Sequence, residues 1–139
     1  QYAAATQGSG FIGWGAGFGF DFKNTGINAL TRQPYDVTGF TGFLFWIKGT
    51  TTKIRVSVLS TDVVPPTEGG TCSTLCNDAH GLLIDVTNTW TEHVVPFSML
   101  KQEGWGTPET LAPPNVLSIL FQTAAAVPFD HRVDDVGLY

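Results

Sequence analysis

Apolar and polar side chains alternate in short runs along this chain, and glycine- and proline-rich segments separate the runs. Because every second side chain of a β-strand points to the same face, this alternation predicts half-buried strands. We expect strands at residues 14–22, 39–49, 53–59, 82–86, 91–97, 116–123 and 129–136. No segment keeps a helical period over about 11 residues, so the pattern predicts an all-β fold, either a sandwich or a jelly roll.

The longest apolar run, at residues 39–49, predicts a strand with two unlike faces. One parity of this run is apolar and forms a core face, made of Phe43, Phe45 and Ile47. The other parity carries Trp46 and Lys48, which indicates a surface that meets more than water. We expect the strand at residues 53–59 to pair with this run through a short hairpin.

Three glycines lie on one face of the strand at residues 14–22, namely Gly15, Gly17 and Gly19. Glycine weakens a strand, because it packs no side chain and loses more backbone entropy on folding. The pattern therefore indicates that another backbone or a ligand approaches this face closely.

The long loop at residues 62–80 contains both cysteines of the chain, Cys72 and Cys76. Because this turn-rich stretch has no core of its own, we expect a disulfide that clamps the loop, with two unrelated thiols as the alternative. A disulfide favours an oxidising, secreted or extracytoplasmic compartment. Zinc would need two further soft ligands, and His80 alone does not supply them.

Length and composition predict one domain over residues 1–139, with a sizeable core. Charged residues make up only 14% of the chain, and its 16 glycines and 10 phenylalanines are typical of a glycine-rich β protein. The net charge of -5 and seven scattered basic residues argue against nucleic acid. No apolar run reaches the roughly 18 residues of a membrane span. The chain starts at Gln1 without methionine, which indicates a processed or excised form.

The sequence resembles the galactose-binding-like jelly-roll domains related to family 11 carbohydrate-binding modules, which are found attached to bacterial polysaccharide-degrading enzymes. The resembling segments run in the family's order over nearly the whole chain, at residues 13–18, 35–36, 42–49, 68–72, 90–91, 95–97, 104–107, 119–122 and 133–136. Each segment is weak alone, but the ordered set is fairly specific for the fold and less so for a ligand.

The resemblance implies a jelly-roll β-sandwich, and it points to Asp134 as a side-chain ligand of a structural calcium ion. The alternative is that Asp134 and Asp135 are a solvent-facing pair at a strand end, with their carboxylates on opposite faces. Similar domains begin with an extra acidic strand, and this chain starts just short of one. The last strand also differs, because it carries His131 and Arg132 where similar domains often have leucine and tryptophan.

If the second faces of these strands form one concave binding surface, seven residues belong to it by parity. They are Trp46, Lys48, Arg55, Ser57, Gln122, Asp130 and Arg132. Sugar recognition suits this set, because an indole ring stacks on the C–H face of a pyranose and planar polar groups bind pairs of hydroxyls. The alternative is that Trp46 lies beneath a loop and the charges form a solvated face.

The remaining tryptophans and two of the histidines have structural interpretations. We expect Trp14 and Trp90 in the core, and Trp105, between two glycines, as a loop anchor that packs inward. Parity places His93 and His131 on inward faces, where a core histidine is commoner than a ligand. No nucleophile elbow, zinc-protease motif or phosphate loop occurs in the sequence.

These observations predict a non-catalytic domain that binds a polysaccharide of the β-glucan type on the concave face of a sheet. Its partner would be an attached or partner enzyme, which the domain targets to its substrate. The alternative is a structural or protein-interaction β-sandwich of a secreted multimodular protein, which full burial of Trp46 would favour. An enzyme ranks third, and would need Asp78 and His80 to meet another carboxylate around an open metal position.

Overall fold

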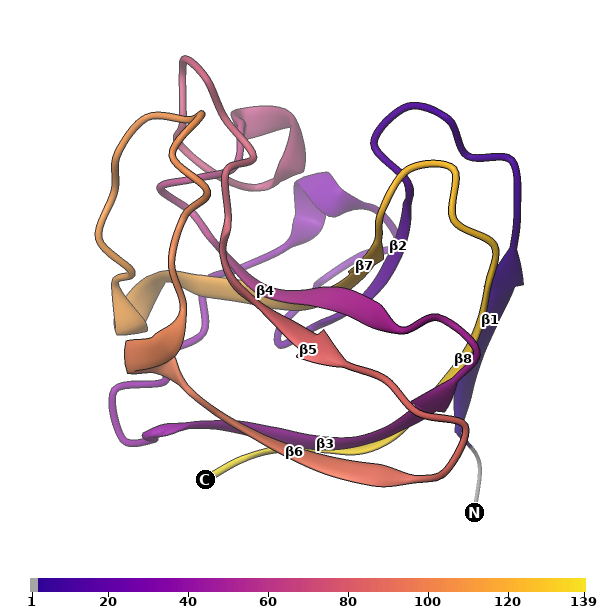
Figure 1. Ribbon diagram of the computed structural model, residues 1–139. Coiled ribbons are helices and arrows are strands. Elements are labelled where there is room, and N and C mark those ends of the chain that lie inside the picture. The colour runs from indigo at the N-terminus through magenta and orange to yellow at the C-terminus, as the bar shows by residue number, and fades with distance from the viewer. Residues whose placement is uncertain (1–2) are drawn as a thin grey trace.

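The computed structural model describes residues 3–139 and shows two antiparallel β-sheets packed face to face (Figure 1). Within that range sheet I has the strand order β1-β8-β3-β6, and sheet II has the order β2-β7-β4-β5. The strands are β1 (Ala4–Gly8), β2 (Ala16–Asp21), β3 (Gly42–Gly49), β4 (Lys53–Ser60), β5 (His80–Asp85), β6 (Thr91–Pro96), β7 (Val116–Thr123) and β8 (Phe129–Leu138). The predicted all-β jelly-roll sandwich is confirmed.

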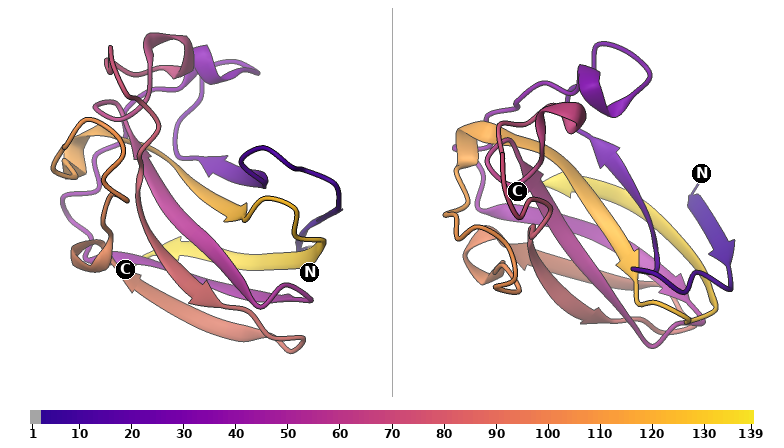
Figure 2. Two further views of the ribbon diagram at one scale, coloured as in Figure 1. Left: turned by 45° about the horizontal axis from the view of Figure 1, so that its top comes forward. Right: turned by 90° about the horizontal axis from the view of Figure 1, so that it is seen from above.

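Short 3-10 turns lie in the connections between strands. They are η1 (Ala29–Thr31), η2 (Pro66–Glu68), η3 (Phe97–Met99) and η4 (Pro113–Asn115). No helix in residues 3–139 is long and apolar enough to cross a membrane. The loops gather at the two ends of the sandwich, as the further views in Figure 2 show.

The inward faces of the two sheets form one continuous core. Phe43, Phe45 and Ile47 of β3 are fully buried, as the alternation predicts. Phe45 meets Phe121 of β7 edge to face, with ring centroids 5.0 Å apart, so the two sheets interlock through aromatic rings. A smaller cluster around Leu59 lies beneath the loop at residues 61–79.

The predicted hairpin between β3 and β4 is wrong, because the two strands belong to different sheets. In sheet I, β3 pairs with β6 and β8, while in sheet II β4 pairs with β5 and β7. Each strand has a fully apolar face, so the two faces can meet across the core instead of lying side by side. The short link at residues 50–52 therefore crosses from one sheet to the other.

A strand does precede Trp14, contrary to the prediction that the chain starts short of it. β1 pairs with β8, with Ala4 opposite Val133, and its sequence contains no carboxylate. The strand is hard to predict because it offers small and polar side chains, and pairing with β8 supplies its hydrogen bonds.

The glycine face of β2 is explained by the backbone of β7. Gly15 has a φ of 93°, and a Cβ there would collide with the carbonyl group of Thr123. A Cβ at Gly19 would lie 2.5 Å from the carbonyl oxygen of Ile119. Of the two predicted reasons, a neighbouring backbone accounts for these positions.

A β-bulge interrupts the pairing of β8 with β3. Leu44 lies opposite Gly137 and Trp46 opposite Asp134, so β8 carries an extra residue between these pairs. Asp135, within the bulge, adopts a left-handed conformation with a φ of 49°. Bulges change the direction of nearby side chains, and this bulge changes the surroundings of Asp134 and Asp135.

Candidate functional site

The seven predicted binding residues do not share one face. Trp46, Lys48, Asp130 and Arg132 lie on the outer face of sheet I, whereas Arg55, Ser57 and Gln122 lie on β4 and β7 in sheet II. Because β3 and β4 lie in different sheets, equal parity along the chain puts their outward side chains on opposite sides of the molecule. The single predicted surface is therefore corrected to two separate faces.

The outer face of sheet II lies between loops that rise at both ends of its strands (Figure 1). Across this face, Gly17 of β2, Gln122 of β7, Arg55 of β4 and Leu83 of β5 form one register row. Gly17 is exposed, and Leu83 is 61% exposed. The row therefore combines the exposed backbone of Gly17, the planar polar groups of Gln122 and Arg55, and the apolar side chain of Leu83.

Arg55 of the inner strand β4 is held by contacts that its guanidinium makes across the edge strand β5. Its Nη2 donates to the carbonyl oxygens of Lys101 at 2.8 Å and Ala79 at 3.1 Å, and its Nη1 lies 3.7 Å from Glu103 Oε1. The guanidinium crosses β5 at Gly81, where a Cβ would lie 2.9 Å from Arg55 Cζ. Ser57 is buried beside it, so the structure does not support Ser57 as a contact residue.

Two tryptophans lie in the loops that flank this face, and both were wrongly predicted to pack inward. Trp14 is 70% exposed, and its carbonyl oxygen accepts a 3.0 Å hydrogen bond from Gln122 Nε2. Trp105 is 52% exposed, and its Nε1 donates to Glu103 Oε2 at 3.1 Å. Both tryptophans lie between two glycines, which indicates a loop, and the alternation of side chains along a strand gives no information there.

Asp78 anchors the loop that carries Trp105. Its carboxylate accepts hydrogen bonds from the backbone N–H groups of Glu103, Gly104 and Gly106 at 2.9, 2.8 and 3.0 Å. Burial opposes the charged form, but these hydrogen bonds outweigh it and lower the pKa of Asp78 below its ordinary value. The indole of Trp105 is thus attached to a fixed backbone.

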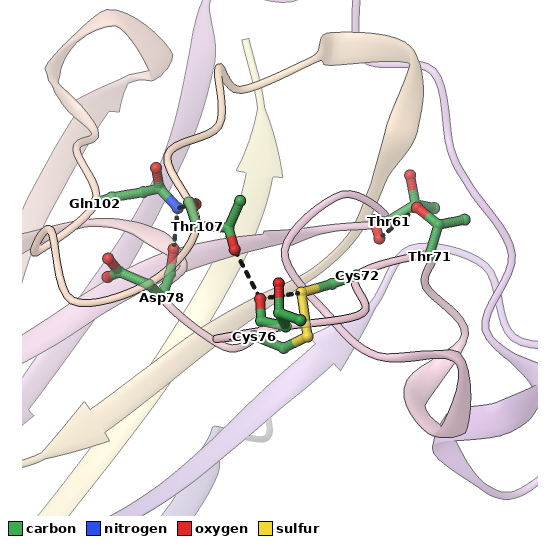
Figure 3. Close-up of a disulfide and its surroundings, with 8 residues drawn as sticks. Thr61, Thr71, Cys72, Cys76, Asp78, Gln102 and Thr107 are labelled. Atoms are coloured by element: carbon green, nitrogen blue, oxygen red, sulfur yellow. Dashed lines mark hydrogen bonds between the residues drawn. A yellow bond between two sulfur atoms is a disulfide. The ribbon is translucent and has the colours of Figure 1, made fainter.

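The predicted disulfide between Cys72 and Cys76 is present and closes the neighbouring loop (Figure 3). Thr107 joins this loop to the Trp105 loop, because its Oγ1 donates to the carbonyl oxygen of Thr74 at 2.7 Å. Gln102 Nε2 also donates to the Asp78 carbonyl oxygen at 2.8 Å. The disulfide loop and the Trp105 loop therefore form one connected wall beside sheet II.

The outer face of sheet I carries the other two tryptophans. Trp46 is 37% exposed, so it is not buried beneath a loop, which was the alternative interpretation. Trp90 is 38% exposed, so the prediction that it lies in the core is wrong. Lys48 Nζ lies 5.0 Å from the centroid of the Trp90 ring. Arg132 is paired with Asp130, with Nη1 and Oδ1 2.8 Å apart.

Solved structures share this architecture. The family 11 carbohydrate-binding module of the cellulosomal cellulase Lic26A-Cel5E of Clostridium thermocellum is 18% identical, with a TM-score of 0.65 over 99% of this chain and 81% of that one. A family 11 module from the same organism, in complex with a β-1,3-1,4-mixed-linked tetrasaccharide, is 16% identical, with a TM-score of 0.64 over 99% and 84%. The family 30 module of cellulase Cel9D-Cel44B from that organism is 15% identical, with a TM-score of 0.68 over 99% and 73%.

The fold is that of the carbohydrate-binding modules. No protein-family model matches the sequence, and no curated protein matches it significantly. At these identities the likeness shows the fold, and the site has to be argued from this chain's own residues.

In this fold, the calcium site that the resemblance implies would rely on Asp134 for a side-chain ligand. The first strand contributes no carboxylate, and within residues 3–139 no three or more histidine, cysteine, aspartate or glutamate side chains lie together in a group that could hold a metal ion. Calcium takes six to eight oxygen ligands, of which Asp134 and Asp135 supply few. Calcium binding therefore stays an untested prediction, and the proposals below do not use it.

Asp78 and His80, the pair that an enzyme would use, both hold loops of this domain in place. The carboxylate of Asp78 accepts the three backbone hydrogen bonds described above, and His80 Nε2 lies 3.0 Å from the carbonyl oxygen of Glu109. Both contacts fix segments next to the Trp105 loop. Nothing about these two residues favours a catalytic role over a structural one.

The two core histidines are where parity predicts them. His131 is 2% exposed and stacks on Phe129, and His93 stacks on Phe45 with ring centroids 5.5 Å apart. Burial lowers the pKa of both imidazoles below the ordinary value, although nearby Asp85 and Asp130 act in the opposite direction.

Proposed function

We propose that this protein binds polysaccharide without catalysis, on the outer face of sheet II. One observation carries the proposal: two exposed indoles, Trp14 and Trp105, flank a face on which Arg55 and Gln122 are held by hydrogen bonds. The shared fold with carbohydrate-binding modules supports the same conclusion. In a secreted parent protein, such a domain would target an attached or partner enzyme to its substrate.

The chemistry of this face suits a neutral glycan. The apolar C–H face of a pyranose stacks on an indole ring, which explains the use of exposed tryptophan. Arg55 Nη2 already donates to two backbone carbonyl oxygens, so Nη1, 3.7 Å from Glu103 Oε1, is the donor that Arg55 can add, and the Gln122 amide offers both a donor and an acceptor. Because backbone contacts already orient both side chains, a sugar would cost little further side-chain entropy on binding.

The glycan class we propose is a β-glucan. Support comes from the module that was solved with a β-1,3-1,4-mixed-linked tetrasaccharide and shares this fold. The face crosses four strands, and three interstrand spacings of about 4.8 Å span about 14 Å, which suits an oligosaccharide rather than a single sugar. The Cys72–Cys76 disulfide agrees with an oxidising, extracytoplasmic compartment.

Affinity electrophoresis against soluble glycans tests the proposal. We expect mixed-linkage β-glucan to retard the protein, and Trp14→Ala and Trp105→Ala each to weaken binding roughly tenfold, since one stacked ring contributes about 1.4 kcal/mol. Trp90→Ala is the matched control, because it removes an exposed indole from the opposite sheet. If no glycan in the panel retards the protein, the structural or interaction alternative replaces this proposal.

A further inference from the structure

The carboxylate of Glu103 lies between two groups of the proposed glycan face. Its Oε2 accepts a 3.1 Å hydrogen bond from the indole Nε1 of Trp105, and its Oε1 lies 3.7 Å from Arg55 Nη1. Trp105 belongs to a loop that flanks the face, whereas Arg55 lies in the register row that crosses the sheet. Glu103 therefore connects the stacking ring with the polar floor of the face.

The main chain fixes the position of Glu103. Its N–H donates to Asp78 Oδ1 at 2.9 Å, and the N–H of Gly104 donates to Asp78 Oδ2 at 2.8 Å. Gly104 has a φ of 94°, a left-handed conformation that favours glycine, so the local sequence suits the turn after Glu103. The side chain of Glu103 is 54% exposed and can be reached by a ligand.

The ionic side chains on the strands of sheet II are paired within residues 3–139. The pairs at strand ends are Lys53–Asp85 and Asp21–Arg32. Arg55 is the remaining cation on these strands, and its partner is Glu103. The face is therefore close to electrically neutral, although a guanidinium lies in it.

The distance between Arg55 and Glu103 leaves a donor for a sugar. At 3.7 Å, Nη1 is attracted to the carboxylate but is too far away for a hydrogen bond, so it can donate to a sugar hydroxyl while its charge stays balanced. A carboxylate group on the sugar would instead meet the negative charge of Glu103 beside this donor. The contact at Oε2 also fixes the ring of Trp105, because an indole held at Nε1 cannot turn freely.

We propose that Glu103 determines specificity at this face, by selecting neutral over carboxylated glycans and by positioning the Trp105 ring for stacking. The first role follows from the charge that faces Arg55, and the second from the hydrogen bond to the indole. Because it names the class of glycan that the site accepts, this inference rests on the proposed function.

Titration calorimetry at low salt and pH 7 tests the selection of neutral glycans with two matched ligands. They are mixed-linkage β-glucan and the same glucan after oxidation of its primary hydroxyl groups to carboxylates. Glu103→Gln keeps an oxygen that can accept the indole N–H but removes the charge. We expect the native protein to prefer the neutral glucan, and Glu103→Gln to reduce this preference about threefold, because exposed ion pairs are weak.

Glu92→Gln is the control for this change, because it removes the same charge from an exposed position on β6 in the opposite sheet. We expect it to leave the preference unchanged. An equal reduction by Glu92→Gln and Glu103→Gln would overturn the proposal, since it would indicate an effect of net charge alone. An unchanged preference in Glu103→Gln would overturn it too.

The NMR signals of the four indole N–H groups test the positioning role without any glycan, and Trp105→Ala identifies the signal of Trp105. We expect Glu103→Ala to move this signal and to weaken binding of the neutral glucan about fivefold, as for the loss of one hydrogen bond. In a Trp105→Ala background, the same change should weaken binding less than about twofold, because no ring is left to position. An unmoved signal, or equal weakening in both backgrounds, would contradict this role.

The outcomes separate this inference from the function on which it rests. A native protein that binds the neutral glucan, with a preference that Glu103→Gln leaves intact, removes only the role of Glu103. A native protein that binds neither form of the glucan removes the proposed function, and the specificity role with it.

Discussion

Replacing Asp78 with asparagine should destabilise the protein strongly, although the side chain keeps its size. Oδ1 of Asp78 accepts one backbone N–H, and Oδ2 accepts those of Gly104 and Gly106 at 2.8 and 3.0 Å. An asparagine that keeps the Oδ1 contact turns its own NH₂ group toward the other two donors. Leaving a buried donor unsatisfied costs about 1–3 kcal/mol, so we expect a loss of about 3 kcal/mol.

Urea unfolding at pH 7 measures this loss as a lower midpoint with an unchanged slope. Asp62→Asn is the matched control in the same loop, because the hydrogen bonds of the Asp62 carboxylate within the described part of the chain are long, at 3.3 Å to Thr61 Oγ1 and 3.5 Å to Asn115 Nδ2. We expect it to change stability by less than about 0.5 kcal/mol. An equally small effect of Asp78→Asn would refute the anchoring role.

The pH dependence of this loss has a defined sign. Because the folded-state pKa of Asp78 is lowered, its stabilisation is fully present above the ordinary value of 3.8 and is lost as the pH falls through the folded value. The difference in unfolding free energy between native protein and Asp78→Asn should therefore narrow below about pH 4. A constant difference down to pH 2 would contradict the hydrogen-bonded carboxylate.

Two further perturbations test the core and the loop wall. Burial lowers the pKa of His131 in the folded protein, so the free energy of unfolding should fall as the pH drops through the ordinary value of 6.5 and level off below the folded pKa. In His131→Phe, the urea midpoint should depend less on pH over this range. An unchanged pH dependence would contradict a buried neutral imidazole. The double variant Cys72→Ala, Cys76→Ala removes a disulfide between residues four apart, and the chain-entropy relation predicts a loss of about 2 kcal/mol in the free energy of unfolding. Reduction of the native protein should cause the same loss. An unchanged urea midpoint would show that the two connected loops keep their structure without the disulfide.

Alternation in the sequence is sufficient to assign seven of the eight strands within residues 3–139 and their inward faces, but not β1. Phe43, Phe45 and Ile47 are buried because apolar side chains at every second position can leave water only together. Alternation does not identify strand partners, which is why β3 and β4 were wrongly placed side by side. The pairing depends on which strands best fill the core between the sheets, and this is a property of the whole chain.

The candidate site was only partly predictable, because its decisive features lie outside regular strands. Trp14 and Trp105 lie in loops, where parity carries no information, and their exposure follows from how those loops are anchored. The bulge at Asp135 arises from the pairing of β8 with β3, so the local sequence pattern does not predict it. Trp46 was correctly identified as an outward residue, but it belongs to a different face from Arg55 and Gln122.

Oxidation mapping of the four tryptophans, with and without mixed-linkage β-glucan, tests the central claim most directly. All four indoles are accessible, so each peptide can report on protection by the glycan. Binding on sheet II predicts that glucan protects Trp14 and Trp105 and leaves the oxidation of Trp46 and Trp90 unchanged. Protection of Trp46 and Trp90 alone, or of none of the four, would contradict it.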